Sequence, residues 1–413
     1  MNVQITRHAL DRVPLSLLID DSTLLVNLSY FWMRDRNAVD GENRRWEDVP
    51  VVIPESFTRT FAEWCLAHGV RGKYSVVPCP AGLGRVDEQI PLFTGSQHES
   101  WLKMCRETIM PAFDITPEML THSVVVDPKT LKPLPSGIWE QYEWVSLPDD
   151  EDGPIIEYIA TACRILDQAG LPPTGVTSPG YFGGQTLSFY THCLGQAVRS
   201  VSGTPTPFFF TRSADRGRVE SPVWHKDKKQ GIGVGEMITC AGDWTGNWTG
   251  YGEVSADRYI TDDLQGGRLP EVIDAGDPAL LCSHWQGFYG LHNEDQRGFK
   301  TLQTVVERLK ARDPNGEWTQ WRKCSEIAGY TCCREMAEIK VEKNTIELDL
   351  PVLSSELTLR VTGADVKEVK VDGKPLRVAK TRRVFISGTF IRFADETLVA
   401  FDPKARKVRI EVA

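Results

Sequence analysis

Two adjacent carboxylates, Asp20 and Asp21, directly follow an apolar run that begins at Leu15. Such a run predicts a buried strand, and in α/β barrels the catalytic and metal-binding groups lie where the strands end. Neighbouring side chains on a strand point in opposite directions, so one carboxylate can bind a metal while the other accepts a proton. The alternative is that one of them only caps the following turn, together with Ser22 and Thr23.

Two histidines occupy comparable positions. His122 ends a strand-like segment that begins at Glu118, and His284 ends an apolar segment that begins at Pro278. Each could instead be a hydrogen-bonded structural residue. Because the carboxyl ends of parallel strands gather on one face of a barrel, we expect both histidines to lie beside the two aspartates at one mouth. Carboxylates and imidazoles bind divalent metals and also transfer protons.

The elements that must position these residues alternate between helix and strand. Helical periodicity predicts helices over residues 54–69, 99–113, 154–170, 187–201 and 298–311. Strand-like runs cover residues 73–78, 118–123, 175–180, 207–211 and 278–284. This alternation predicts parallel strands connected by helices, and hence an α/β barrel.

Two regions depart from the alternation. Residues 213–276 are rich in Gly, Trp, Asp and Thr, and so long a polar and aromatic segment indicates a functional loop. From about Met336 onward, short alternating runs joined by turns predict an antiparallel, sandwich-like β module. We therefore predict a catalytic barrel over residues 1–335, with an insertion at about 213–276, and an accessory β domain over residues 336–413.

The net charge and the cysteine pattern limit the kinds of partner and the cellular compartment that we expect for this chain. The net charge of −9 argues against nucleic acid or an anionic membrane as the main partner. No apolar run has the length of a membrane span, and the first residues show no signal peptide. The ten cysteines include no Cys-x-x-Cys pair, so we expect small buried side chains in a reducing compartment. A cytoplasmic enzyme is expected, or a secreted one if a leader has been removed.

The landmarks and their order resemble the motifs of the polysaccharide deacetylases. Asp20-Asp21 resembles the first motif of this family, and residues 61–78 resemble the helix and strand that follow it. Thr121-His122-Ser123 is similar to the second motif, Ser178-Pro179-Gly180-Tyr181 to the third, and Leu281-Cys282-Ser283-His284 to the last. The resemblance covers roughly residues 10–335. It implies a distorted (β/α)7 barrel with a metal-dependent hydrolase site.

The resemblance also implies roles for individual residues. Asp20 would be the general base, Asp21 and His122 metal ligands, and His284 the general acid that assists the leaving group. Backbone amides near Tyr181 would help to stabilise the oxyanion. The implied cofactor is a divalent ion, with zinc as the first choice. The implied reaction is removal of an acetyl group, as an amide or ester, from a saccharide.

The chain departs from the family pattern in two places. The second motif usually reads His-(Ser/Thr)-x-x-His, whereas residues 122–127 read His-Ser-Val-Val-Val-Asp, so the second histidine is absent. Asp127 or His98 could replace it, because carboxylate and imidazole both suit zinc. The alternative is that the metal site has been lost. The arginine that usually opens the third motif is absent as well.

Aromatic side chains gather in the later loops. Tyr181, Trp244, Trp248, Trp285 and Tyr289 are predicted to bind substrate, because flat aromatic rings stack on the apolar faces of sugars. The alternative is that these rings pack against one another in a local core.

Two other functions stay open at this point. One is a glycoside hydrolase or lyase, in which Asp21 and either Asp243 or Asp263 flank the scissile bond. The other is a barrel without catalytic activity that binds sugars through its aromatic loops.

Overall fold

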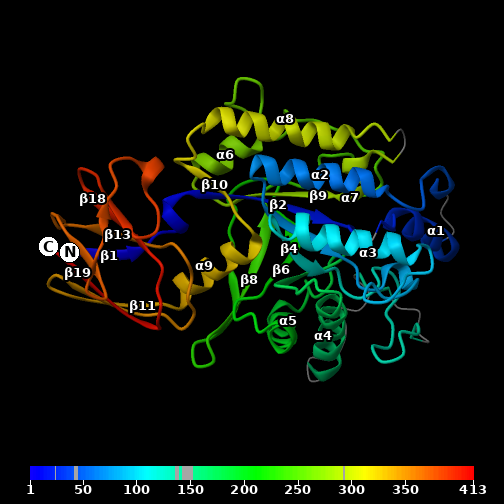
Figure 1. Cartoon of the computed structure of the whole chain (residues 1–413), viewed down its shortest axis with the longest axis horizontal. Coiled ribbons are helices and arrows are strands. Elements are labelled where there is room, and N and C mark those ends of the chain that lie inside the picture. Colours follow the sequence, from blue (N-terminus) through cyan, green and yellow to red (C-terminus); the bar gives the residue numbers. More distant parts are fainter. Residues whose placement is uncertain (24, 41–44, 135–138, 142–151, 292–293) are drawn as a thin grey trace.

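Parallel strands form the centre of the protein in a computed structural model, which describes residues 1–23, 25–40, 45–134, 139–141, 152–291 and 294–413 (Figure 1). In chain order these strands are β2 (Val13–Asp20), β3 (Gly72–Val76), β4 (Phe113–Pro117), β5 (Gly175–Thr177), β6 (Phe208–Ser213), β8 (Ile232–Thr239) and β9 (Ala279–His284). The expected α/β class with parallel strands is confirmed.

The parallel strands belong to two sheets that meet at both edges. β9, β2, β3 and β4 are neighbours in one sheet, and β5, β6 and β8 are neighbours in the other. Parallel bridges between Glu118 and Thr177 and between Ala241 and Leu281 link the two sheets. The strand order therefore returns to its starting point. The short strand β10 (Thr319–Trp321) pairs with the beginning of β2.

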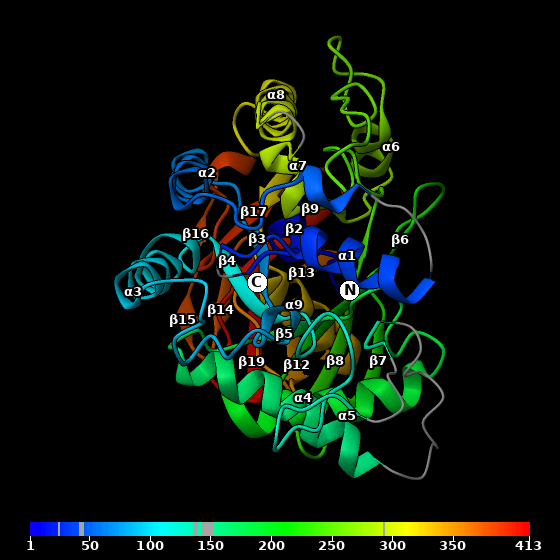
Figure 2. The same ribbon diagram turned by 90° about the vertical axis from the view of Figure 1, so that its right-hand side faces the viewer.

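Helices surround these strands (Figure 2). They are α1 (Leu28–Asp40), α2 (Glu55–His68), α3 (Gly95–Met104), α4 (Asp152–Gln168), α5 (Leu187–Ser202), α6 (Arg268–Asp274), α7 (Trp285–Tyr289), α8 (Arg297–Arg312) and α9 (Cys324–Met336). α2 shows how local sequence sets the bounds: Gly69 adopts the left-handed conformation (φ 69°) that ends a helix. The apolar residues of α1 to α8 pack against the strands in one large core. Those of α9 belong to two smaller clusters, one with side chains of β2, β6, β8 and β9 and one with residues 346–412.

The strand predicted over residues 118–123 lies earlier, at Phe113–Pro117. The polar residues in this stretch obscure the strand pattern, because they are buried for specific reasons. Asp114, for example, accepts hydrogen bonds from the backbone nitrogen (2.7 Å) and the hydroxyl (2.8 Å) of Ser325 at the start of α9. Residues 118–123 form the turn after the strand, in which Met119 and His122 have positive φ angles.

The segment 213–276 is more than a loop, since it contains β7 (Val223–Asp227), α6 and the fully buried strand β8. Two glycines give β8 a loop-like sequence. A Cβ atom on Gly233 would lie 2.7 Å from Cys332 Sγ, and one on Gly235 would lie 3.3 Å from Ala328 Cβ. The glycines therefore let α9 pack closely against β8, and a structural strand occupies part of the predicted insertion.

Two further sheets form a module at one end of the molecule (Figure 1). Their strands are β11 (Glu338–Glu342), β12 (Thr345–Asp349), β13 (Leu357–Thr362), β14 (Val369–Val371), β15 (Lys374–Pro375), β16 (Arg377–Val378), β17 (Thr389–Arg392), β18 (Glu396–Phe401) and β19 (Lys407–Val412). Strand β1 (Asn2–Ile5) pairs antiparallel with β13, so the first residues of the chain lie in this module. A 3-10 turn over Arg382–Val384 lies between β16 and β17.

All ten cysteines are buried and unpaired, as small apolar residues are expected to be. Within the described ranges, the helices lack the combination of length and apolarity that a bilayer crossing requires.

Candidate active site

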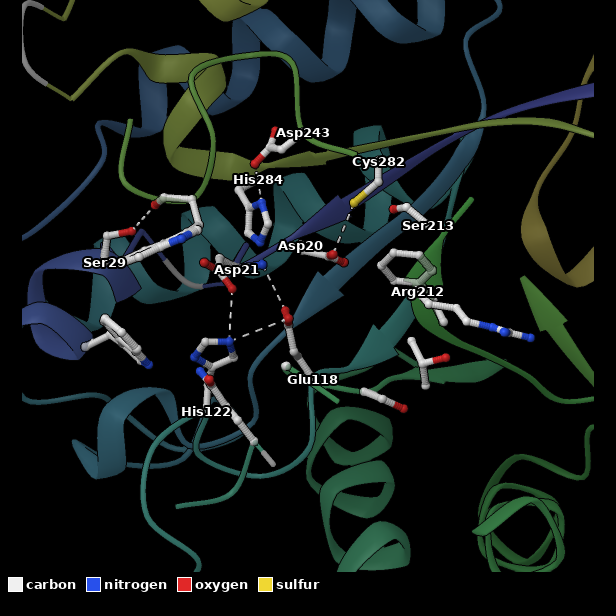
Figure 3. Close-up of a pocket in the computed structure, with 17 residues that line it drawn as sticks. Asp20, Asp21, Ser29, Glu118, His122, Arg212, Ser213, Asp243, Cys282 and His284 are labelled. Carbon is white, nitrogen blue, oxygen red and sulfur yellow. Dashed lines mark hydrogen bonds and ion pairs between the residues drawn. The ribbon is translucent and has the colours of Figure 1, made fainter. Parts of the chain in front are cut away.

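A pocket of about 430 Å³ lies at the carboxyl ends of β2, β6 and β9 (Figure 3). Its lining comprises Asp20, Asp21, Ser29, Trp32, Glu118, His122, Gln141, Ser178, Gly180, Phe210, Thr211, Arg212, Ser213, Asp243, Trp248, Cys282 and His284. The structure thus brings together the two aspartates and the two histidines that the sequence singled out. Asp20 and His284 even pair in register on the neighbouring strands β2 and β9.

Asp20 at the end of β2 forms an ion pair with Lys73 of the neighbouring strand β3. The Lys73 side chain is completely buried, and its Nζ also donates to the Ile19 carbonyl (3.1 Å) and to Thr177 Oγ1 (2.6 Å). Burial alone would lower the pKa of Lys73, but the negative charges of Asp20 and Glu118 outweigh it and raise the pKa. The other carboxylate oxygen of Asp20 accepts a hydrogen bond from Cys282 Sγ (3.3 Å). Both oxygens of the Asp20 carboxylate therefore have a partner, and one of these partners is the positively charged Lys73.

Asp21, Glu118 and His122 form a second cluster beside Asp20. His122 Nε2 lies 3.0 Å from Asp21 Oδ1 and 3.6 Å from Glu118 Oε1. Glu118 Oε2 accepts hydrogen bonds from the Asp21 backbone nitrogen (2.9 Å) and from Ser75 Oγ (2.7 Å). One donor atom from each of the three residues lies within 4.8 Å of the others, and all three side chains are buried.

Glu118 is the member of this cluster that was not predicted from the sequence. It directly follows Pro117, the last residue of β4, so it occupies the strand-end position that we assigned to His122. A correct strand boundary would have identified it, because a carboxylate at the end of a buried strand was the signal used for Asp20.

Burial and mutual charge shift the pKa values of all three side chains in the cluster. Burial raises the pKa of Glu118 to about 7, and repulsion from Asp20 and Asp21 adds to the shift. For His122, burial would lower the pKa, but Asp21 and Glu118 raise it to about 9. For Asp21, burial would raise the pKa, yet the neighbouring histidines His122 and His284 lower it to about 2. Two carboxylates and an imidazole are a donor set that fits a divalent metal ion.

His284 faces this cluster from the opposite side. Its Nδ1 is hydrogen bonded to the carboxylate of Asp243, which also accepts a hydrogen bond from Ser283 Oγ (3.1 Å). Figure 3 shows the His284 ring between Asp243 on one side and Asp20 and Asp21 on the other. Burial would lower the pKa of His284, but Asp243 and Asp21 raise it to about 10. The imidazole is therefore held in its protonated form.

This arrangement predicts a pH dependence of stability. The folded-state pKa of His284 lies above its ordinary value of 6.5. The stabilisation of the fold by the charged imidazole is therefore complete below about pH 6.5 and is lost as the pH rises through about 10. Asp243→Asn should reduce stability at pH 6 by about 1–2 kcal/mol and have little effect at pH 10.5. Denaturant unfolding of both proteins in chelator, across this range, measures the difference. An equal loss at both ends of the range would contradict the assignment.

Two residues considered as a third metal ligand do not reach the pocket. The Asp127 carboxylate accepts hydrogen bonds from the backbone nitrogens of Lys129 (3.0 Å) and Thr130 (2.8 Å), so it shapes a local turn. His98 lies buried in α3, with Nε2 2.9 Å from the Val86 carbonyl oxygen. Glu118 occupies the position beside Asp21 and His122 that we had considered for them.

The predicted aromatic residues divide into two groups. Trp248 lines the pocket, where it meets Trp32 of α1 edge to face at 4.6 Å between ring centroids. Trp244, Trp285 and Tyr289 are buried in the core, so self-packing explains them. The Tyr181 side chain is exposed and lies outside the pocket lining, although its neighbour Gly180 belongs to it. Trp32 also lines the pocket, although it was not predicted from the sequence.

Of the carboxylates considered for a glycosidase, Asp243 lies in the pocket and Asp263 does not. Asp263 accepts hydrogen bonds from Thr261 Oγ1 (2.5 Å) and from the Gln265 backbone nitrogen (3.0 Å) in an exposed turn.

Comparison with known proteins gives only distant likenesses. No family model matches the sequence, and no curated protein matches it. Among solved structures, the chain is similar to a candidate polysaccharide deacetylase from Mycobacterium smegmatis (TM-score 0.41, 11% identity, covering 81% of this chain and 95% of that one). It is also similar to Puue allantoinase, with a TM-score of 0.39 and 12% identity, covering 77% of this chain and 90% of that one. A third similar structure is a glycoside hydrolase family 5 protein from Bacteroides vulgatus, with a TM-score of 0.37 and 10% identity, covering 99% of this chain and 93% of that one. Because likenesses of this level do not define an activity, we base the proposed function on the pocket itself.

Proposed function

We propose that this chain is a hydrolase of the polysaccharide deacetylase type, which removes an acyl group from a saccharide. The observation that carries the proposal is the convergence of Asp20, the cluster of Asp21, Glu118 and His122, and the His284–Asp243 pair in one pocket. A proton acceptor, a cation site and a proton donor are the three parts that hydrolysis of an amide or ester requires. The closed order of parallel strands supports a (β/α)7 barrel as the scaffold.

Asp21, Glu118 and His122 would hold the divalent ion, with zinc as the first choice. When bound, such an ion polarises the carbonyl of the substrate and makes a water molecule more acidic. The buried side chains of the cluster keep competing solvent away from this position. In this proposal, Glu118 takes the part of the second histidine that the family motif would supply.

Asp20 would accept the proton of the attacking water. Lys73 holds one of its carboxylate oxygens, while the residue lines the pocket beside the cation cluster. His284 would donate a proton to the leaving amine or alkoxide, since Asp243 keeps its Nδ1 engaged and stabilises the imidazolium. The cationic partner Lys73 favours the ionised form of a carboxylate, which can act as a base. The anionic partner Asp243 favours the protonated form of His284, which can act as an acid.

The pocket walls suit a sugar. Trp32 and Trp248 provide flat apolar surfaces on one side, which can stack on the faces of a sugar ring. Ser29, Gln141 and Ser178 add polar side chains for hydroxyl groups. In this proposal the β module of residues 336–413, together with β1, is an accessory domain without catalytic residues.

The test combines elemental analysis of the purified protein with assays on an acetylated chito-oligosaccharide, before and after chelator treatment. We expect about one divalent ion per chain and acetate release that stops in chelator and returns with added metal. Release of new reducing ends in chelator would overturn the proposal in favour of a glycosidase that uses paired carboxylates. Binding of the oligosaccharide without turnover would overturn it in favour of a sugar-binding barrel.

A further inference from the structure

The turn that carries two of the proposed metal ligands has an unusual backbone. Glu118 and His122 lie at its ends, and both Met119 and His122 adopt positive φ angles of 48° and 58°. Residues other than glycine avoid this region because Cβ collides with the backbone. Such a conformation persists only where surrounding contacts fix it. Something outside the turn must therefore hold it in place.

Glu140 supplies those contacts. Its side chain is completely buried, and its carboxylate accepts hydrogen bonds from three successive backbone nitrogens of the turn, those of Leu120, Thr121 and His122. The Tyr158 hydroxyl of α4 donates a further hydrogen bond to the same carboxylate. A buried carboxylate is tolerated when it is hydrogen bonded in this way.

The position of Glu140 separates it from the chemistry. Glu140 does not line the pocket, although the next residue, Gln141, does. Its contacts with the turn are to backbone nitrogens, including the amide of His122 itself. The carboxylate thus acts on the direction of the His122 and Glu118 side chains and not on a substrate.

We propose that Glu140 is a positioning residue, which holds the turn of residues 118–122 in the conformation that directs the Glu118 carboxylate and the His122 imidazole toward Asp21. The expected effect of Glu140 on metal affinity rests on the proposed function. The expected effect on the conformation of the turn does not depend on a metal. Metal affinity and amide exchange in the turn therefore test the two effects separately.

The variants are Glu140→Gln, which keeps one oxygen acceptor, and Glu140→Ala, which keeps none. Ile159→Val is the matched control, because Ile159 is a fully buried neighbour of Tyr158 in α4 and its truncation weakens packing without removing a hydrogen bond to the turn. Tyr158→Phe removes one donor but leaves the three backbone hydrogen bonds. For each protein we would measure the dissociation constant for Zn²⁺, the absorption spectrum with Co²⁺ and the hydrogen exchange of amides 118–124.

Loss of an outer partner of a metal ligand weakens metal binding by about 10- to 100-fold. We expect this for Glu140→Ala, together with an altered Co²⁺ spectrum and fast exchange at residues 120–122. Glu140→Gln should lie between Glu140→Ala and the wild type. Ile159→Val and Tyr158→Phe should bind Zn²⁺ like the wild type. If Glu140→Ala does not fold, the same three measurements on Glu140→Gln alone decide whether Glu140 positions the turn.

Two results would overturn the inference. One is unchanged Zn²⁺ affinity in the Glu140 variants despite lower stability, which would make Glu140 a structural residue only. The other is unchanged exchange of amides 120–122. If the wild type binds no divalent ion, the proposed function fails, and the exchange measurement alone then decides whether Glu140 holds the turn.

Discussion

Replacement of Lys73 by methionine is expected to lower the free energy of unfolding by about 3–5 kcal/mol and to abolish activity. The Lys73 side chain is completely buried, and its ammonium group is the counter-charge of Asp20. Without it, the Asp20 carboxylate is a buried charge without its partner, which is costly, and nothing holds it in the position that the proposed base requires. Denaturant unfolding and the deacetylation assay measure the two effects.

The double variant Lys73→Met/Asp20→Asn provides the control. It also removes the charge of Asp20, so it should be more stable than Lys73→Met while remaining inactive. A single variant that unfolds like the wild type would show that the ion pair does not form in solution. Activity that survives in Lys73→Met would remove Asp20 from the role of base.

The second large effect concerns the separation of metal binding from proton transfer. His122→Ala and Glu118→Ala should lose both the divalent ion and the activity, because each removes one of three donors in the cluster. Asp20→Asn should retain the ion and lose activity by about 10²- to 10⁴-fold, the usual contribution of a general base. Metal stoichiometry and acetate release on the same samples give both values.

Asp127→Asn is the matched control for this series. It removes a carboxylate that the sequence also offered as a ligand, but that serves a local turn in the structure. We expect wild-type metal content and activity from it. Loss of the ion in Asp127→Asn with retention in Glu118→Ala would contradict the ligand set proposed for the pocket.

Glu118 changes how the missing second histidine is understood. The chain lacks that residue, yet a carboxylate from the end of β4 lies within 3.6 Å of the His122 imidazole. In the proposed function, Glu118 on one side of the turn takes the place of a histidine on the other side, and the cluster keeps three donors.

The sequence by itself determined the α/β class and the placement of the main chemical groups. Asp20 and His284 could be located because each ends an apolar run, and parallel strands bring their carboxyl ends together. This signal is local, since it depends only on the order of apolar and polar residues along a few positions. Helical periodicity is local for the same reason, and α2 and α8 lie within one residue of their predicted bounds. The helix predicted over residues 99–113 instead covers Gly95–Met104, and α1 and α9 were not predicted.

Which side chains contact one another, and which are buried, was decided only by the tertiary structure. In the sequence, Lys73 is one polar residue in a strand, and its ion pair with Asp20 exists because β3 lies next to β2 in the sheet. Trp244 and Trp248 have nearly the same sequence surroundings, yet one is buried in the core and the other lines the pocket. Glu140 lies 18 residues from His122, and no local pattern connects it to the turn. Such contacts depend on the packing of distant segments, so periodicity carries no signal for them.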